Sequence, residues 1–149
     1  MRRHPGSRTQ PQFNVEPLRA SLAGAGIEYA WCEALGGRRK ARPDSHNTRW
    51  RNASFRGYAD YMETPAFAAA FDALTARCDT RRCAIMCAEV LWWRCHRSLL
   101  ADALQAGGRP VAHIAADGTL VAHPYTAAAW IDRGRLRYDG DPEQPTLDL

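Results

Sequence analysis

Apolar residues follow two different spacings along the first 114 positions of the chain. A helical spacing, with Asn14 and Thr64 as N-caps of the first two segments, predicts three helices, at about 15–25, 65–77 and 95–106. Short continuous apolar runs predict strands between them, at 27–32, 82–87 and 110–114. One or two further helical turns are expected at 57–62.

This alternation predicts an α/β fold: a small, mostly parallel sheet with helices on both faces, in a three-layer, Rossmann-like arrangement. The run at 82–87 is typical of a strand covered on both faces. After Ala115 we expect a hairpin, a short helix near 126–131 and a last strand at 135–138. We expect residues 1–138 to form a single domain and the acidic segment 139–149 to be frayed.

The composition of the chain favours a globular domain without a membrane span or a secretory signal. The chain has 149 residues, of which 46% are apolar and 24% charged, which is ordinary for a globular domain. No window approaches the roughly 18 unbroken apolar residues of a membrane span, and the first 14 residues lack the apolar core of a secretory signal. Five cysteines, an odd number without a C-x-x-C pair, favour free thiols and the cytoplasm.

Basic residues concentrate in one predicted loop. The net charge is +4, and residues 38–56 contain seven basic side chains opposed only by Asp44. A loop this basic suits phosphate, carboxylate or nucleic acid, although a solvated loop has the same composition. Arg38 and Arg39, together with Ser7 and Arg8 near the N-terminus, are therefore candidate ligand-binding residues.

The most informative stretch runs from the strand at 82–87 through Glu89 to a helix that begins with Cys95, His96 and Arg97. Ligands of parallel sheets bind beyond the carboxyl ends of the strands, and a helix N-terminus attracts anions. We expect Arg97 to face an anion or to pair with Glu89. At this position the Cys95 thiol should have a lowered pKa, and His96 could act as an acid or base.

Structural interpretations of the same residues stay open. Cys95 can cap the helix or pack inward, His96 can lie on the surface, and Glu89 with Arg97 can form an ion pair that only fixes the loop. Cys87 fits a core position better than a nucleophile. A Cys87–Cys95 redox pair and a metal site that adds His96 and His113 are weaker alternatives, because the spacing is not a standard ligand spacing. We therefore expect no metal and no cofactor.

Known cysteine catalysts do not match the spacing after Cys87. A tyrosine-phosphatase loop requires Arg after five intervening residues, where this chain has Trp93 and places Arg94 one position later. A rhodanese-type loop requires it after four, where Trp92 stands. Phosphate-binding glycine loops and serine-hydrolase motifs are absent as well.

Several motifs together resemble the bacterial and archaeal family called domain of unknown function 488. They are Met86-Cys87-Ala88-Glu89 with Arg94-Cys95-His96-Arg97, the turn Leu35-Gly36-Gly37, the segment Tyr58-Ala59-Asp60-Tyr61-Met62, and Pro5-Gly6-Ser7-Arg8 with Phe13-Asn14. The resemblance implies a small α/β fold and a cytoplasmic protein, without an established reaction. Family members open with a strand, an I-G-H-S-like turn, a helix and a D-V-R strand, so the resemblance also implies that this chain is truncated at its N-terminus.

These observations lead to three hypotheses of function. The first is an α/β protein that binds a phosphate-bearing small molecule or nucleic acid through Arg97 and the basic loop, with Glu89, Cys95 or His96 moving protons or attacking. The second is a thiol-dependent enzyme that acts on a small substrate through Cys95. The third is a non-catalytic nucleic-acid-binding module that uses residues 38–56. No membrane partner is expected.

Overall fold

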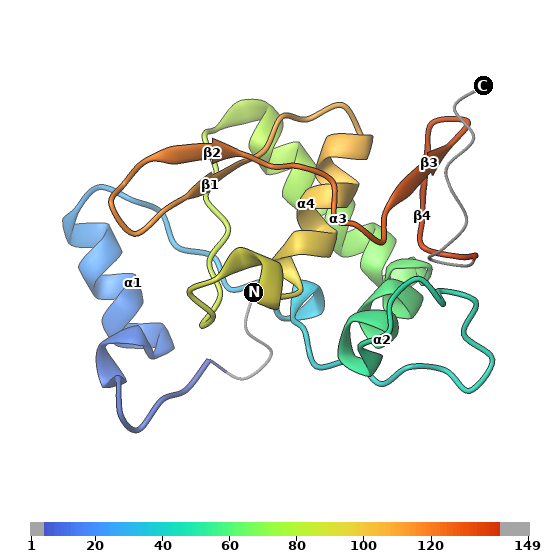
Figure 1. Cartoon of the computed structure of the whole chain (residues 1–149). Coiled ribbons are helices and arrows are strands. Elements are labelled where there is room, and N and C mark those ends of the chain that lie inside the picture. The colour runs from blue at the N-terminus through green and yellow to red at the C-terminus, as the bar shows by residue number, and fades with distance from the viewer. Residues whose placement is uncertain (1–4, 141–149) are drawn as a thin grey trace.

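The computed structural model describes residues 5–140 and contains four helices and two small hairpins (Figure 1). The helices are α1 (Val15–Gly24), α2 (Ala53–Met62), α3 (Pro65–Thr80) and α4 (Arg97–Ala106). Single 3-10 turns precede α1 (η1, Pro11–Phe13), lie in the loop before α2 (η2, Glu33–Leu35) and lead into α4 (η3, Trp92–Arg94). None of the helices among these residues is long and apolar enough to cross a membrane.

Both sheets are two-stranded and antiparallel. Strand β1 (Ala112–Ile114) pairs with β2 (Leu120–Ala122), and β3 (Trp130–Asp132) pairs with β4 (Arg135–Arg137). Each pair is a local hairpin, which needs only a short turn between its strands. Gly118 and Gly134 supply the positive φ angles in these two turns.

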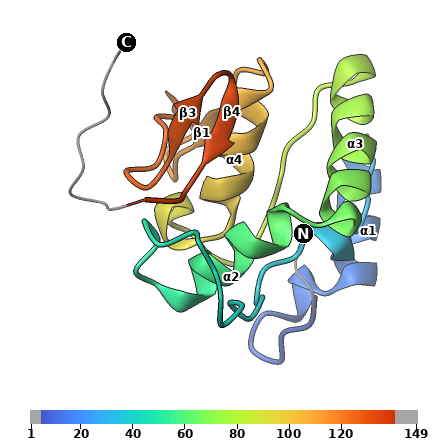
Figure 2. The ribbon, with the colours of Figure 1, turned by 90° about the vertical axis from the view of Figure 1, so that its right-hand side faces the viewer.

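The expected parallel, Rossmann-like sheet is wrong for this structure. Segments 27–32 and 82–87 belong to no strand of the described residues, although the backbone between α3 and η3 is extended and passes between α3 and α4 (Figure 2). Met86 remains 44% exposed and Ile27 53% exposed, so these apolar runs are not covered on both faces. A parallel pair requires a neighbouring strand brought by a crossover, and an apolar run does not reveal whether that neighbour exists.

Local predictions fared better at the helices. Thr64 caps α3 by accepting the Phe67 N–H through its hydroxyl at 3.2 Å, with Pro65 in the first turn, as expected. Helix α1 also lies where expected, but the Asn14 side chain accepts from the Ser7 N–H rather than from the helix. The short helix expected near 126–131 is wrong, because residues 130–132 form β3.

The core lies where α2, α3 and α4 meet the turn η2. Tyr58 is fully buried at its centre, donates its hydroxyl to the Leu35 carbonyl at 2.9 Å and meets Phe67 edge to face. Leu99, Leu100 and Leu104 bring α4 into the same core. Burial of each such side chain stabilises the fold by about 1.5–3 kcal/mol. The shared core of α4 and η2 therefore holds the start of α4 in place relative to η2.

The basic loop is held against α2 by its backbone. A Cβ atom at Gly57 would lie 2.4 Å from the Arg39 carbonyl oxygen, so only glycine permits this approach. The buried Asp60 carboxylate accepts the Arg42 N–H at 2.8 Å and the Ser45 hydroxyl at 2.5 Å. The loop therefore has a defined path before α2.

The chain remains attached to the fold as far as Gly140. Thr48 donates its hydroxyl to the Gly140 carbonyl at 2.8 Å, and the Trp130 indole donates to the Asp139 carbonyl at 3.0 Å. The rest of the tail that was expected to fray, residues 141–149, lies outside the described residues.

Candidate thiol site at the start of helix α4

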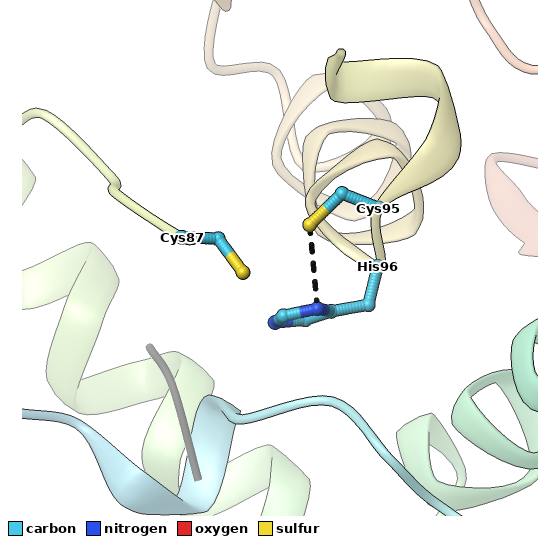
Figure 3. Close-up of side chains that lie close together, drawn as sticks. All are labelled: Cys87, Cys95 and His96. Carbon is cyan, nitrogen blue, oxygen red and sulfur yellow. Dashed lines mark hydrogen bonds between the residues drawn. The ribbon is translucent and has the colours of Figure 1, made fainter. Parts of the chain in front are cut away.

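Cys87, Cys95 and His96 form a cluster between the extended segment after α3 and the beginning of α4. Their two sulfur atoms and one imidazole nitrogen all lie within 4.8 Å of one another. Figure 3 shows both thiols pointing toward the His96 ring, one from each segment. Cys87 is partly exposed, whereas Cys95 and His96 are buried. Cys87 is therefore the most exposed residue of the cluster.

The His96 ring is positioned by glycine and tyrosine. A Cβ atom at Gly37 would lie 2.6 Å from His96 Nδ1, so the glycine leaves the space that the ring occupies. The Tyr58 ring also lies close to the imidazole, with the ring centroids 5.0 Å apart. His96 Nδ1 is 3.5 Å from Cys95 Sγ, while the buried Nε2 has no hydrogen-bond partner among the described residues.

The two thiols differ in acidity. The neighbouring Cys95 thiol lowers the pKa of Cys87 well below its usual range, and the nearby imidazole of His96 acts in the same direction. The neighbouring Cys87 sulfur and burial of the thiol both raise the pKa of Cys95. Cys87 is therefore the more acidic thiol of the pair. The sequence prediction of a low pKa at Cys95 is corrected by this second thiol.

The Cys95 sulfur still caps the helix. It accepts the Arg97 N–H at 3.5 Å, and the Ser98 hydroxyl donates to the Cys95 carbonyl at 2.9 Å. A polarisable acceptor at a helix N-terminus satisfies one of the N–H groups that the first turn leaves free. Cys95 thus serves the start of α4, whereas Cys87 makes no such contact with a helix end among the described residues.

Arg97 supports the loop instead of facing open solvent. Its guanidinium donates to the backbone carbonyls of Glu89 and Val90. The expected ion pair with the Glu89 carboxylate is not among the ion pairs of the described residues, and Glu89 is exposed. The bonds that Arg97 makes hold the turn between Cys87 and Cys95.

The remaining sequence candidates lie elsewhere. The Ser7 hydroxyl accepts the Gln10 N–H in the N-terminal turn, and the Arg8 side chain is exposed. Arg39 lies over the Tyr61 ring, 3.7 Å from its centroid, and donates to the Gly36 carbonyl, whereas Arg38 is exposed. No hydrogen bond or ion pair of the described residues connects these four residues to the thiol cluster.

The cluster offers the donor atoms of a soft metal ion. Two thiolates and one imidazole are ligands that Zn²⁺ accepts, and a tetrahedral ion would need one more. His113, which the sequence added to this set, instead bonds to His123. The same three side chains can also support thiol chemistry without a metal. The donor set alone therefore does not distinguish a metal site from a reactive thiol site.

A surface hollow of about 360 Å³ lies between α2, α4 and the β3–β4 hairpin. Its lining includes Glu63, which pairs with His46 at 2.8 Å, but none of the three residues of the thiol cluster. The thiol cluster is therefore separate from this hollow.

Sequence reasoning did not foresee that Gly37 and Tyr58 lie against the His96 ring. Cys87 was interpreted as a core thiol because its neighbours in sequence are apolar. The paired glycines at 36 and 37 were the available signal, since such a pair marks a close backbone approach. What they approach, the His96 ring, lies nearly sixty positions further along the chain and only the fold reveals it.

A family model described as "Domain of unknown function DUF488" matches residues 1–104. The matched range includes the turn at Gly37, all three residues of the thiol cluster and Arg97, but ends before β1. No curated protein and no solved structure matches the chain.

Proposed function

The chain belongs to the DUF488 family, whose description names no reaction, and we propose from the geometry of the site that it is a thiol-dependent enzyme. In this proposal Cys87 is the nucleophile, Cys95 stabilises its thiolate by donating a hydrogen bond, and His96 is the proton-transferring group. The substrate class is a small molecule with an electrophilic carbon or sulfur.

The observation that carries this proposal is the proximity of a partly exposed cysteine, a buried cysteine and an imidazole. A thiolate is the reactive form of cysteine, and a neighbouring donor lowers the pKa that controls its population. The attack would form a bond from Cys87 Sγ to the electrophile and displace a leaving group. His96 Nε2, which has no partner among the described residues, is available to supply the proton that the leaving group needs.

The pH dependence of alkylation tests the assignment. Iodoacetamide labelling of each cysteine would be measured by peptide mass spectrometry, with the exposed Cys83 as the internal reference. An ordinary thiol loses about tenfold in rate for each pH unit below its pKa of about 8.5. We expect Cys87 labelling to stay nearly constant over the range where Cys83 labelling falls, and Cys95 to react most slowly. Parallel profiles for Cys87 and Cys83 would reject the proposal.

A matched pair of variants tests the role of Cys95. Cys95→Ser keeps a hydroxyl that can donate to Cys87, whereas Cys95→Ala removes the donor. We expect the Cys87 profile to move toward that of an ordinary thiol in Cys95→Ala and to move less in Cys95→Ser. Labelling after treatment with a chelator tests the metal interpretation of the same donors. If the chelator changes the alkylation rate of Cys87, the three donors hold a metal ion, and the proposal that Cys87 is a nucleophile is wrong.

Binding of a phosphate-bearing ligand or nucleic acid is a second candidate function. It is favoured by Arg38, Lys40 and Arg51, which are exposed and make no side-chain hydrogen bond or ion pair within residues 5–140. Such binding would weaken steeply with salt. Affinity for a short DNA or RNA would be compared at low and moderate salt in the wild type and in a variant with these three residues changed to Gln. Equal affinity in both proteins would exclude the loop as the binding surface.

A further inference from the structure

A second polar cluster lies between α4 and the hairpin β1–β2, and the thiol site does not use it. His113 Nε2 is 2.8 Å from His123 Nδ1, and His123 Nε2 is 2.9 Å from Asp102 Oδ1. The three side chains thus form one continuous hydrogen-bond chain. Asp102 and His123 are buried, whereas His113 in β1 is only partly buried.

The groups around Asp102 determine which atoms carry protons. Its carboxylate accepts the N–H of Thr126 at 2.9 Å, the hydroxyl of Thr126 at 2.6 Å and the hydroxyl of Tyr138 at 2.8 Å. Burial, followed by the charge of Asp102, raises the pKa of Tyr138, so its hydroxyl keeps its proton and remains a donor. The Thr126 and Tyr138 groups that contact Asp102 are therefore all hydrogen-bond donors, and the Asp102 carboxylate accepts from each of them.

When both rings are neutral, this pattern allows only one arrangement of their protons. His123 Nε2 must carry the proton that Asp102 accepts, so His123 Nδ1 is an acceptor. His113 Nε2 must then carry the proton that His123 accepts, so His113 Nδ1 keeps its lone pair. That nitrogen has no hydrogen-bond partner among the described residues. The chain of bonds thus ends in an unprotonated nitrogen on the accessible ring.

The surroundings of His113 keep the ring neutral and hold it in place. The Trp92 indole lies parallel to the imidazole, with centroids 4.0 Å apart and planes 3° apart. Partial burial, then the neighbouring His123 and the charge of Arg97, lower the pKa of His113 to about 4. Two titratable or charged groups among the described residues thus face the ring: His123, which follows β2, and Arg97, at the start of α4. Asp102 of α4 lies behind His123 and bonds to it.

We propose that His113 Nδ1 is a binding site for the O–H group of a protonated oxyanion, such as dihydrogen phosphate or an acid phosphate monoester, with His123 and Asp102 as positioning residues. The lone pair accepts the hydrogen bond of the ligand, and the positive charge of Arg97 favours its negative charge.

Nuclear magnetic resonance of ¹⁵N-labelled protein tests the tautomer directly. Long-range correlation spectra distinguish a protonated from an unprotonated ring nitrogen, and His113 should show an unprotonated Nδ1 and a protonated Nε2 near neutral pH. In His123→Phe, which keeps an aromatic ring but removes the acceptor, His113 should become a mixture of both tautomers. A mixture in the wild type, or a protonated Nδ1, would overturn the proposal even if the variant did not fold.

A comparison of two anions tests the ligand. At a pH of about 6, every inorganic phosphate ion carries an O–H group and most of it is dihydrogen phosphate, whereas sulfate has a similar shape and no O–H group. Dihydrogen phosphate should shift the Nδ1 resonance of His113 in a saturable manner, and sulfate at equal ionic strength should not. Equal responses to the two anions, or no response to phosphate, would contradict the site. Cys87→Ser should respond to phosphate as the wild type does, because the thiol cluster takes no part.

Discussion

Asn47 donates its side-chain amide to the Asp60 carboxylate, with Nδ2 and Oδ1 2.9 Å apart and both residues buried. The same carboxylate holds the Arg42 N–H and the Ser45 hydroxyl. One buried acid on α2 thereby satisfies three donors of the basic loop. These hydrogen bonds stabilise a single conformation of a long polar loop.

Replacing Asp60 with Asn should destabilise the protein by about 2–4 kcal/mol. The amide has one acceptor oxygen in place of two, so a buried donor of the loop would face an N–H group and lose its partner. Urea denaturation would measure the change in the free energy of unfolding. Asp44→Asn is the control on the same loop, because its side chain is largely exposed, and it should change stability by less than about 0.5 kcal/mol.

Acid should weaken the contribution of Asp60. Burial opposes its ionisation, but hydrogen bonds from Ser45, Asn47 and the Arg42 N–H outweigh burial and lower its pKa. The contribution is therefore complete above the unfolded pKa of about 3.9 and is lost as the pH falls through the lower folded value. The stability difference between wild type and Asp60→Asn should shrink between a pH of about 6 and a pH near 2–3. A difference that stays constant across this range would contradict the linkage.

Gly37→Ala should disturb the thiol site from a distance in sequence. The new methyl group would overlap His96 Nδ1, and the ring would have to shift relative to Cys95 and Cys87. We expect a loss of about 1–3 kcal/mol in stability and a Cys87 alkylation profile closer to that of an ordinary thiol. Gly24→Ala is the matched control, since its methyl group would meet nothing within 4 Å at the end of α1. An unchanged Cys87 profile in Gly37→Ala would show that His96 does not influence the thiol.

Arg97→Met should loosen the turn between the two cysteines. The guanidinium holds the carbonyls of Glu89 and Val90, and Met keeps much of the side-chain length without the donors. Hydrogen exchange should accelerate at residues 88–94, while protection in α3 should change little. Arg94→Met removes a neighbouring exposed arginine and should leave the turn unaffected. Exchange that rises equally throughout the chain would indicate a global role for Arg97.

Helix positions were predictable because their signals are local. Thr64 and Pro65 lie within one turn of the helix that they start, and the spacing of Phe67 and Leu74 already specified the side that packs inward. Strands depend on a partner that the sequence does not name. Ala112–Ile114 pairs with the segment that follows it, which is a hairpin and not a parallel neighbour, and residues 82–87 lie in no ladder of the described chain.

The candidate site was found only in part for the same reason. Cys95, His96 and Arg97 attracted attention because they are adjacent at a predicted helix start, and α4 indeed begins at Arg97. The acidity of the thiols depended on the approach of Cys87 from another segment, which raises the pKa of Cys95 where a lowered one was expected. Arg97 was expected to face an anion, but the carbonyls that it binds could not be inferred from charge.

The parallel contact between Trp92 and His113 couples the fluorescence of Trp92 to the protonation state of His113. An excited indole transfers an electron to a protonated imidazole far more readily than to a neutral one, and the two rings are only 4.0 Å apart. Emission from Trp92 should therefore dim as His113 takes up a proton near a pH of about 4. Unlabelled protein thus signals the charge of this one ring by its fluorescence, and Trp92→Phe would identify the contribution of this indole among the five tryptophans of the chain.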